Sequence, residues 1–389
     1  MNTLSDLDLS ATRALVRVDF NVPMDGATIT DDTRVRAALP TIQALLDAGA
    51  TPVLLSHLGR PKGAPDPTFS LRPVADHLGT LLDAPVVFCE STVGEAAQAC
   101  VAGAPDGAVV LLENTRFLAG ETLNDPETAR QLAALGDVFV SDAFGSVHRA
   151  HASTAGVAAL LPHAAGRLLE REITFLTKAL DDPERPFVAV LGGAKVSDKI
   201  GVIEALAPKV DALLIGGAMA YTFMAGLGHQ TGASLVEDDR VDDAFRLFER
   251  FRDTIKLPSD HVAADRFAAD AETRIVADEI PEGLMGLDIG PQTREQYAQI
   301  IGGAKTVIWN GPMGVFELTP FAQGTLAVAQ ALADATAERE ALTVVGGGDS
   351  VAAVVQAGLA DAVTHVSTGG GAMLEFMEGQ TLPGLSALA

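Results

Sequence analysis

Short apolar runs recur along the chain and are separated by longer segments rich in alanine and leucine. Runs of this length and composition are typical of buried strands, and the longer segments favour helices. Strands that alternate with helices predict parallel sheets with helices on both faces. The expected strands are residues 14–20, 52–57, 85–89, 108–114 and 137–142 in the first half, and 187–193, 211–217, 306–311, 342–348 and 363–370 in the second.

An amphipathic segment at residues 166–186 separates the two halves. Leu169, Ile173, Leu176 and Leu180 recur at helical spacing, and the sequence Asp-Asp-Pro-Glu-Arg-Pro ends the pattern. A length of 389 residues also exceeds what one hydrophobic core usually organises. We therefore predict an α/β protein with two doubly wound parallel-sheet (Rossmann-like) domains joined by a hinge helix. The expected boundaries are 1–166 for the first domain, 167–182 for the helix and hinge, and 183–377 for the second domain.

Charge and composition narrow the class of partner. Asp and Glu number 51 against 27 Lys and Arg, so the net charge of −24 disfavours binding to nucleic acid or to anionic membranes. Cys89 and Cys100 are too few for a disulfide framework or a zinc site. The first ten residues lack the basic and apolar regions of a signal peptide, and no apolar run approaches the ~18 residues of a membrane helix. We expect a cytoplasmic protein.

Cations and polar residues follow the predicted strands of the first half. Because the carboxyl ends of parallel strands meet at one edge of a sheet, these side chains should lie together. At ~4 Å each cation attracts an anion by roughly 4 kcal/mol before desolvation, so the cluster predicts a pocket for a small polyanion. Taken singly, each arginine could also be a solvated loop residue. The candidates are Arg17, Asp19, Asn21, Arg34, His57, Arg60, Lys62, Asn114, Arg116, Asp142, His148, Arg149 and His151.

The histidines of this set leave two interpretations open. His57, His148 and His151 could bind a ligand or make structural hydrogen bonds. They could also bind a metal or act as a general base, although His-Arg-Ala-His alone offers few metal ligands.

Glycine clusters follow the strands of the second half. The segment LGGAKVSDKI comes after an apolar run, and Lys195 and Lys199 would lie at i, i+4 on one face of the helix expected there. It is not a P-loop, because no second glycine stands at the required spacing before either lysine. Glycines let backbone N–H groups approach phosphate oxygens at a helix N-terminus. The further clusters are GGGDS at 346–350 and TGGGA at 368–372, the latter with Gly369, Gly370 and Gly371.

Two acidic residues of the second half are candidates for nucleotide chemistry. Asp349 could cap a helix and hold a magnesium ion. Glu317 could accept hydrogen bonds from ribose hydroxyls, or be a solvated loop carboxylate. A polyanion pocket in one half and a phosphate-and-metal pocket in the other indicate a bilobal phosphotransferase that closes to exclude water.

Eight motifs in this order resemble the phosphoglycerate kinase family over about residues 13–380: RVDFNVP, SHLGRPKG, ENTRF, DAFGSVHRAHAS, GGAKVSDK, NGPMGVFE, GGGDS and STGGGA. The resemblance implies reversible, magnesium-dependent phosphoryl transfer between ATP and 3-phosphoglycerate, giving ADP and 1,3-bisphosphoglycerate. The acceptor is a carboxylate that is already ionised at neutral pH, so no general base is needed. The resemblance also implies a monomer whose C-terminal segment, residues 378–389, folds back onto the first domain.

The resemblance assigns roles to particular residues. Lys195 and Arg34 would be the catalytic groups that stabilise the phosphoryl group in flight, and Asp349 would bind magnesium. Two alternatives are an ATP-dependent kinase of another small phosphorylated acid and a non-catalytic binding protein, although the presence of these three residues favours an active enzyme. Phosphoglycerate would contact Asp19, Asn21, Arg34, His57, Arg60, Arg116 and Arg149, and the nucleotide would contact Lys195, Lys199, Glu317, Gly346, Gly347, Gly348, Asp349 and Ser350.

Overall fold

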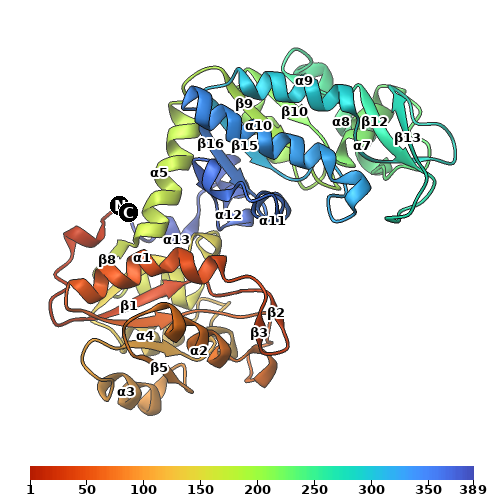
Figure 1. Cartoon of the computed structure of the whole chain (residues 1–389). Coiled ribbons are helices and arrows are strands. Elements are labelled where there is room, and N and C mark those ends of the chain that lie inside the picture. Colours follow the sequence, from red (N-terminus) through yellow and green to blue (C-terminus); the bar gives the residue numbers. More distant parts are fainter. The chain divides into compact units, whose positions relative to one another are not determined.

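The computed structural model describes residues 1–389 and divides into two compact units. The first unit comprises residues 1–173 and 381–389, and the second comprises residues 174–380. Each unit contains a parallel sheet flanked by helices (Figure 1). The predicted fold class of two α/β units with parallel sheets is confirmed, and every predicted strand is present. Helix α5 (Arg167–Asp181) begins in the first unit and ends in the second.

The first unit has six parallel strands in the order β5-β6-β4-β1-β7-β8. The first strand, β1, lies between β4 and β7, and the chain visits one side of it before crossing to the other. Loops at the carboxyl ends of strands open a crevice where the strand order reverses in this way. The bounds are β1 (Arg13–Val18), β4 (Thr51–Leu55), β5 (Val86–Cys89), β6 (Val109–Leu112), β7 (Val138–Asp142) and β8 (His163–Ala165).

The helices of the first unit pack apolar faces onto this sheet. In α1 (Thr33–Asp47), Val35, Ile42 and Leu45 are fully buried at helical spacing and join the core formed by β1. The short α13 (Pro383–Ser386) lies in the first unit, where the backbone N–H of Gly384 donates to the Val147 oxygen at 2.8 Å. The other elements are α2 (Arg72–Leu81), α3 (Gly94–Ala102), α4 (Pro126–Ala133) and the hairpin of β2 (Met24–Asp25) and β3 (Thr28–Ile29).

The parallel sheet of the second unit has the order β11-β10-β9-β15-β16-β17. Its strand order reverses between β9 and β15, so the glycine-rich loops that follow these two strands lie side by side. The parallel strands are β9 (Phe187–Leu191), β10 (Ala212–Ile215), β11 (Ile255–Lys256), β15 (Thr306–Asn310), β16 (Leu342–Gly346) and β17 (His365–Val366). The helices are α6 (Ile200–Leu206), α7 (Met219–Gly226), α8 (Val241–Arg250), α9 (Pro291–Gly302), α10 (Gln323–Arg339), α11 (Gly348–Gln356) and α12 (Gly370–Met377).

A separate antiparallel sheet in the second unit was not predicted. It has the order β13-β12-β14, with bounds β12 (Asp260–Ala264), β13 (Thr273–Ala277) and β14 (Met285–Ile289). Its central strand starts with Asp260 and His261, and most of β13 is exposed, so no apolar run marks these strands in the sequence.

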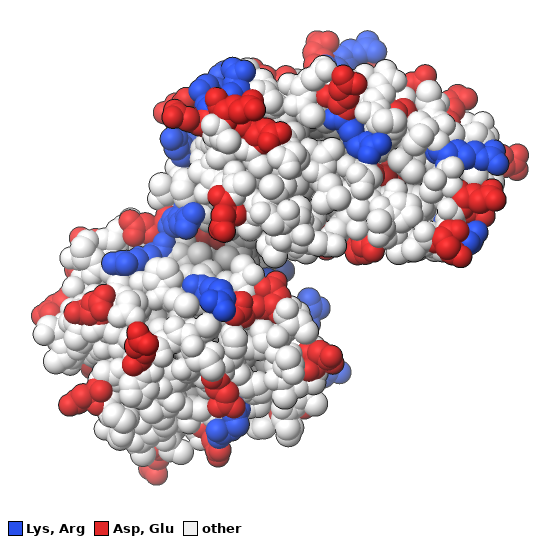
Figure 2. Space-filling model, viewed as in Figure 1, with Lys and Arg blue, Asp and Glu red and all other residues white.

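The surface and the helix lengths bear on the expected partners. Acidic side chains are spread over the visible face of the molecule rather than gathered in one patch (Figure 2). No helix combines the length and apolarity needed to cross a membrane.

Candidate active site

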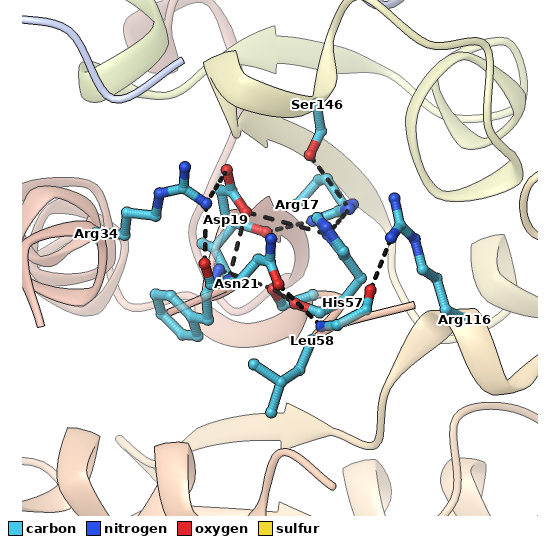
Figure 3. A network of polar contacts seen from close by, with 12 residues as sticks. Arg17, Asp19, Asn21, Arg34, His57, Leu58, Arg116 and Ser146 are labelled. Carbon is cyan, nitrogen blue, oxygen red and sulfur yellow. Dashed lines mark hydrogen bonds and ion pairs between the residues drawn. The ribbon is translucent and has the colours of Figure 1, made fainter. Parts of the chain in front are cut away.

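Arg34 links helix α1 to the loop after β1 in the first unit. Its guanidinium donates to the backbone oxygen of Asn21 at 2.9 Å, and the same nitrogen lies 3.3 Å from the buried Asp19 carboxylate (Figure 3). The Asn21 side-chain oxygen accepts a hydrogen bond from the backbone N–H of Gly59 at 2.8 Å. The Arg34 side chain is 35% exposed, so it can still meet a ligand from solvent.

His57 and Arg17 form the floor of this site. Arg17 lies in β1 and His57 follows the neighbouring strand β4, and an Arg17 nitrogen lies 3.1 Å from His57 Nδ1. Burial lowers the pKa of His57 well below its usual 6.5, and the charges of Arg17, Arg116 and Arg34 lower it further. His57 is therefore neutral at physiological pH.

Arg116 is held by the turns around it. The side-chain oxygen of Asn114 accepts from the Arg116 backbone N–H at 3.0 Å, while its amide nitrogen donates to the Leu58 oxygen at 2.7 Å. The Arg116 guanidinium donates to the Gly59 oxygen at 2.7 Å. Gly59 has φ +62°, and the Phe69 ring lies where a Cβ would stand, so this turn requires glycine.

Arg60 and Arg149 are the exposed cations of the same edge. The charge of Arg60 contributes to lowering the pKa of Arg116, although burial is the largest cause. Burial first, and then Arg17, Arg116 and Arg149, lower the pKa of His151 to about 4. The structure thus brings the predicted first-unit residues to one edge of the sheet: Asp19, Asn21, Arg34, His57, Arg60, Arg116 and Arg149.

The second unit has a cavity of about 610 Å³ at the carboxyl ends of its parallel strands. It is formed by the loops after β9 and β15 and by the first residues of α11 and α12. The lining residues are Gly192, Gly193, Ala194, Lys195, Asp198, Lys199, Asn310, Gly311, Pro312, Gly347, Gly348, Asp349, Gly370, Gly371 and Leu374.

Lys199 is the deepest cation of this cavity. It is 7% exposed, and its ammonium donates to the side-chain oxygen of Asn310. Burial lowers the pKa of Lys199 to about 8, although the carboxylates of Asp198, Asp349 and Glu378 act in the opposite direction. An anion bound in the cavity would add negative charge near this ammonium and so stabilise its charged form.

The prediction that Lys195 and Lys199 share a helical face is wrong. Helix α6 begins only after Lys199, so both lysines lie in the preceding turn. The Glu237 carboxylate accepts from the Ser197 backbone N–H at 3.0 Å and from its hydroxyl at 2.6 Å. Together with a φ of +117° at Gly193, these bonds hold the segment as a loop and leave Lys195 exposed.

Four residues of the predicted nucleotide site do not line this cavity: Gly346, Ser350, Glu317 and Gly369. Gly346 is buried in β16, where a Cβ would meet the sulfur of Met373, so it allows α12 to pack on the sheet. The Ser350 hydroxyl accepts from the Gly311 backbone N–H at 2.7 Å and so positions the loop after β15. Glu317 is exposed on that loop.

The acidic residues of the cavity fit a metal ion that arrives with a nucleotide. No group of three or more His, Cys, Asp or Glu side chains could hold a metal by itself. Asp198 and Asp349 both line the cavity. Magnesium is usually bound through one or two carboxylates together with substrate phosphates, so this donor set fits Mg²⁺.

No role was predicted for Asp198 or Asn310, and Arg17 was predicted only as one of the clustered cations of the first half. Arg17 belongs to the alternating pattern of β1, but only the structure shows that it is 1% exposed. Asp198 stands between the two lysines, and Asn310 ends β15. The signal available in the sequence was a strand end for Asn310 and the two neighbouring lysines for Asp198.

Comparisons with known proteins agree with this geometry. The family model described as phosphoglycerate kinase matches residues 4–380. A phosphoglycerate kinase of Herpetosiphon aurantiacus is 58% identical, covering 99% of this chain and 98% of the relative, and one of Salinibacter ruber is 57% identical with the same coverage. The solved phosphoglycerate kinase of Coxiella burnetii has a TM-score of 0.87 and 42% identity, covering 99% of this chain and 98% of its own. That of Pyrococcus horikoshii has a TM-score of 0.89 and 34% identity, covering 100% of this chain and 98% of its own. The chain therefore belongs to the phosphoglycerate kinase family.

Proposed function

We propose that this chain is an ATP:3-phosphoglycerate phosphotransferase, which acts reversibly between 3-phosphoglycerate with ATP and 1,3-bisphosphoglycerate with ADP. The observation that carries the proposal is the pairing, in one chain of this family, of an arginine-rich sheet edge with a glycine-lined cavity containing two lysines. The first suits an acid that bears a phosphate and a carboxylate. The second suits a nucleotide phosphate chain.

The first unit binds the acid in this proposal. Arg34, Arg60, Arg116 and Arg149 supply charge for its phosphate and carboxylate, and Asp19 and Asn21 orient its hydroxyl. His57, which is neutral, can donate or accept a hydrogen bond without adding charge. Because the acceptor carboxylate is ionised, the site needs position and charge, not a base.

The second unit binds MgATP. Lys199 and the backbone N–H groups of Gly347 and Gly348 grip the phosphate chain, and the exposed Lys195 reaches the phosphoryl group that is transferred. Asp349, with Asp198 beside the lysines, would hold the magnesium ion, which supplies charge neutralisation on the phosphates. For Glu317, Gly346, Ser350 and Gly369–Gly371 we keep the predicted nucleotide roles, with Ser350 acting through the loop that it positions.

Transfer requires the acid and the nucleotide to come into contact. An in-line displacement places the attacking carboxylate and the leaving phosphate on opposite sides of the phosphoryl group, and charge develops on its equatorial oxygens. Lys195 and Arg34 are the proposed donors to those oxygens. We propose that the two units close around the substrates and that the region of α5, residues 167–182, is the hinge. The cytoplasmic location and the monomeric state remain predictions.

A coupled assay tests the proposal. ATP, Mg²⁺ and 3-phosphoglycerate are supplied, and NADH oxidation is followed through glyceraldehyde-3-phosphate dehydrogenase. Turnover that chelation of Mg²⁺ abolishes is expected. Lys195→Ala should lower kcat about 100-fold or more, because removing one charge-stabilising donor typically costs that much, while binding of 3-phosphoglycerate to the first unit stays unchanged. If kcat changed less than tenfold, the role of Lys195 would be wrong. Turnover of another phosphorylated acid but not of 3-phosphoglycerate would overturn the proposed substrate.

A further inference from the structure

Arg17 is a buried cation that the proposed function leaves without a role. It is 1% exposed on the central strand β1, so its donors must find partners inside the protein. Its Nε donates to the Ser153 hydroxyl at 2.9 Å, and one terminal nitrogen donates to the Val18 oxygen. The other terminal nitrogen lies 3.1 Å from His57 Nδ1 and 3.4 Å from the Ser146 hydroxyl (Figure 3).

The contact with Arg17 decides which His57 nitrogen carries the proton. A guanidinium has donors only, so the Nδ1 atom at 3.1 Å must accept and carries no hydrogen. A neutral imidazole with a bare Nδ1 carries its proton on Nε2. His57 Nε2 makes no hydrogen bond to the protein, so this nitrogen is left for a ligand.

We propose that Arg17 is a positioning residue that locks His57 in the neutral Nε2–H tautomer, so that His57 presents a fixed hydrogen-bond donor to the bound acid. The inference rests on the proposed function only for the identity of that acid. The lock itself is a property of the first unit without substrate.

A buried carboxylate fixes Arg17 from the other side. Glu121 is fully buried, and it accepts from the Ser153 hydroxyl at 2.5 Å and from the Ser153 backbone N–H at 3.0 Å. The hydroxyl lies between a group that only donates and one that only accepts, so it must accept from Arg17 and donate to Glu121. Arg17 therefore donates in two directions, to His57 Nδ1 on one side and to the Ser153 hydroxyl on the other, and Ser153 donates in turn to Glu121.

The charges around His57 keep this arrangement neutral over the physiological range. Arg17 of β1 and Arg34 of α1 face it, as do Arg116 after β6 and His151 after β7, and the Asp19 carboxylate is 4.0 Å from Nδ1. Burial is the largest cause of the lowered pKa, and the surrounding cations add to it. A donor of this kind does not lose or gain charge when pH changes near neutrality.

Nitrogen NMR of the histidine-labelled full chain, recorded without substrate, tests the lock. From about pH 6 to about pH 8, the wild-type His57 should show a protonated Nε2 and a bare Nδ1. Ser153→Ala removes the hydroxyl that lies between Arg17 and Glu121 and keeps both of these charged groups. Arg17→Lys keeps the positive charge but replaces the planar guanidinium, with its several donors, by a single ammonium. Both should populate the second tautomer. Arg13→Met, on the same strand but paired with Asp137 at the surface, is the matched control and should leave the His57 signals unchanged.

Kinetics supply the functional readout. Both pocket variants should raise KM for 3-phosphoglycerate about tenfold, the cost of one charge-assisted hydrogen bond, with a smaller change in kcat. A wild-type His57 that is protonated at Nδ1, or variants with unchanged tautomer and KM, would overturn the proposal. The expected spectrum without turnover of 3-phosphoglycerate would support the lock and refute the proposed substrate, so the two failures can be told apart.

Discussion

Lys199 allows the sharpest prediction about the nucleotide cavity. Its ammonium is buried, and its pKa is lowered to about 8 because burial outweighs the attraction of the carboxylates nearby. The unfolded chain, with the ordinary lysine pKa of 10.5, therefore holds more protons than the folded protein between those two values. Stability must then rise with pH across that interval. Without nucleotide, the charged Lys199 destabilises the fold near neutral pH.

The size of this effect follows from the two pKa values. The fall from 10.5 to about 8 corresponds to about 3 kcal/mol at neutral pH, since one pKa step is worth about 1.4 kcal/mol. Lys199→Met removes this cost but leaves the Asn310 side-chain oxygen without its donor, which costs about 1 kcal/mol. We expect the variant to be about 2 kcal/mol more stable than the wild type at neutral pH and to lose this advantage by about pH 10.

Urea unfolding at the two pH values, with Lys209→Met as the control for an exposed lysine, measures the stability. Titration calorimetry measures MgATP binding, which the variant should lose. The wild type should take up protons on binding MgATP at about pH 9, because the phosphates restore the ordinary pKa of the ammonium. A variant that is less stable than the wild type by the same amount at both pH values would refute the reasoning, as would binding without proton uptake.

Three further predictions concern buried titratable groups and the metal. Both ring nitrogens of His261 are buried without a partner, and burial lowers the pKa of His261 to about 4, so the stability of the protein should fall as pH drops below 6.5. In urea unfolding, the stability that His261→Phe gains over the wild type should be about 2 kcal/mol larger at pH 5 than at pH 8. A difference that does not depend on pH would contradict this. Burial raises the pKa of Asp142 to about 8, so the stability of the protein should fall as pH rises toward 8. The melting temperature of Asp142→Asn should therefore rise relative to that of the wild type between pH 5 and pH 8. A relative melting temperature that falls over this range would contradict the prediction. Asp349→Asn should raise the Mg²⁺ concentration for half-maximal turnover about tenfold, and an unchanged value would argue against its role as a ligand.

The strand ends explain why so much of the site could be predicted. Apolar runs locate parallel strands, and parallel strands place whatever follows them at one edge, so a residue such as Arg116 or Asp349 can be assigned to a pocket before its contacts are known. The same logic fails where strands carry no apolar run. Strand β12 begins with Asp260 and His261, and Asp260 is satisfied by the backbone and hydroxyl of Thr293, a pairing 33 residues apart that no local pattern reveals.

The conformation of the loops also could not be predicted from the sequence. The spacing of Lys195 and Lys199 fits a helical face, but Glu237, distant in sequence, binds Ser197 and holds the segment as a turn. A side-chain acceptor from another part of the chain thus decides between two conformations that the local residues permit. The consequence is functional, because the turn leaves one lysine exposed and buries the other.

Burial separates two kinds of cation in this protein. Arg17 and Lys199 are almost fully buried, and each donates a hydrogen bond to a neutral side chain, His57 and Asn310 respectively. Arg34 and Lys195 are accessible, and nothing in their spacing distinguishes them from the buried pair. A buried cation loses its hydration when the protein folds, so its desolvation lowers the stability of the protein. An accessible cation can instead interact with the negative charge that develops on the phosphoryl group during transfer. We therefore expect substitutions of the buried pair to change protein stability and KM, and substitutions of the accessible pair to change kcat.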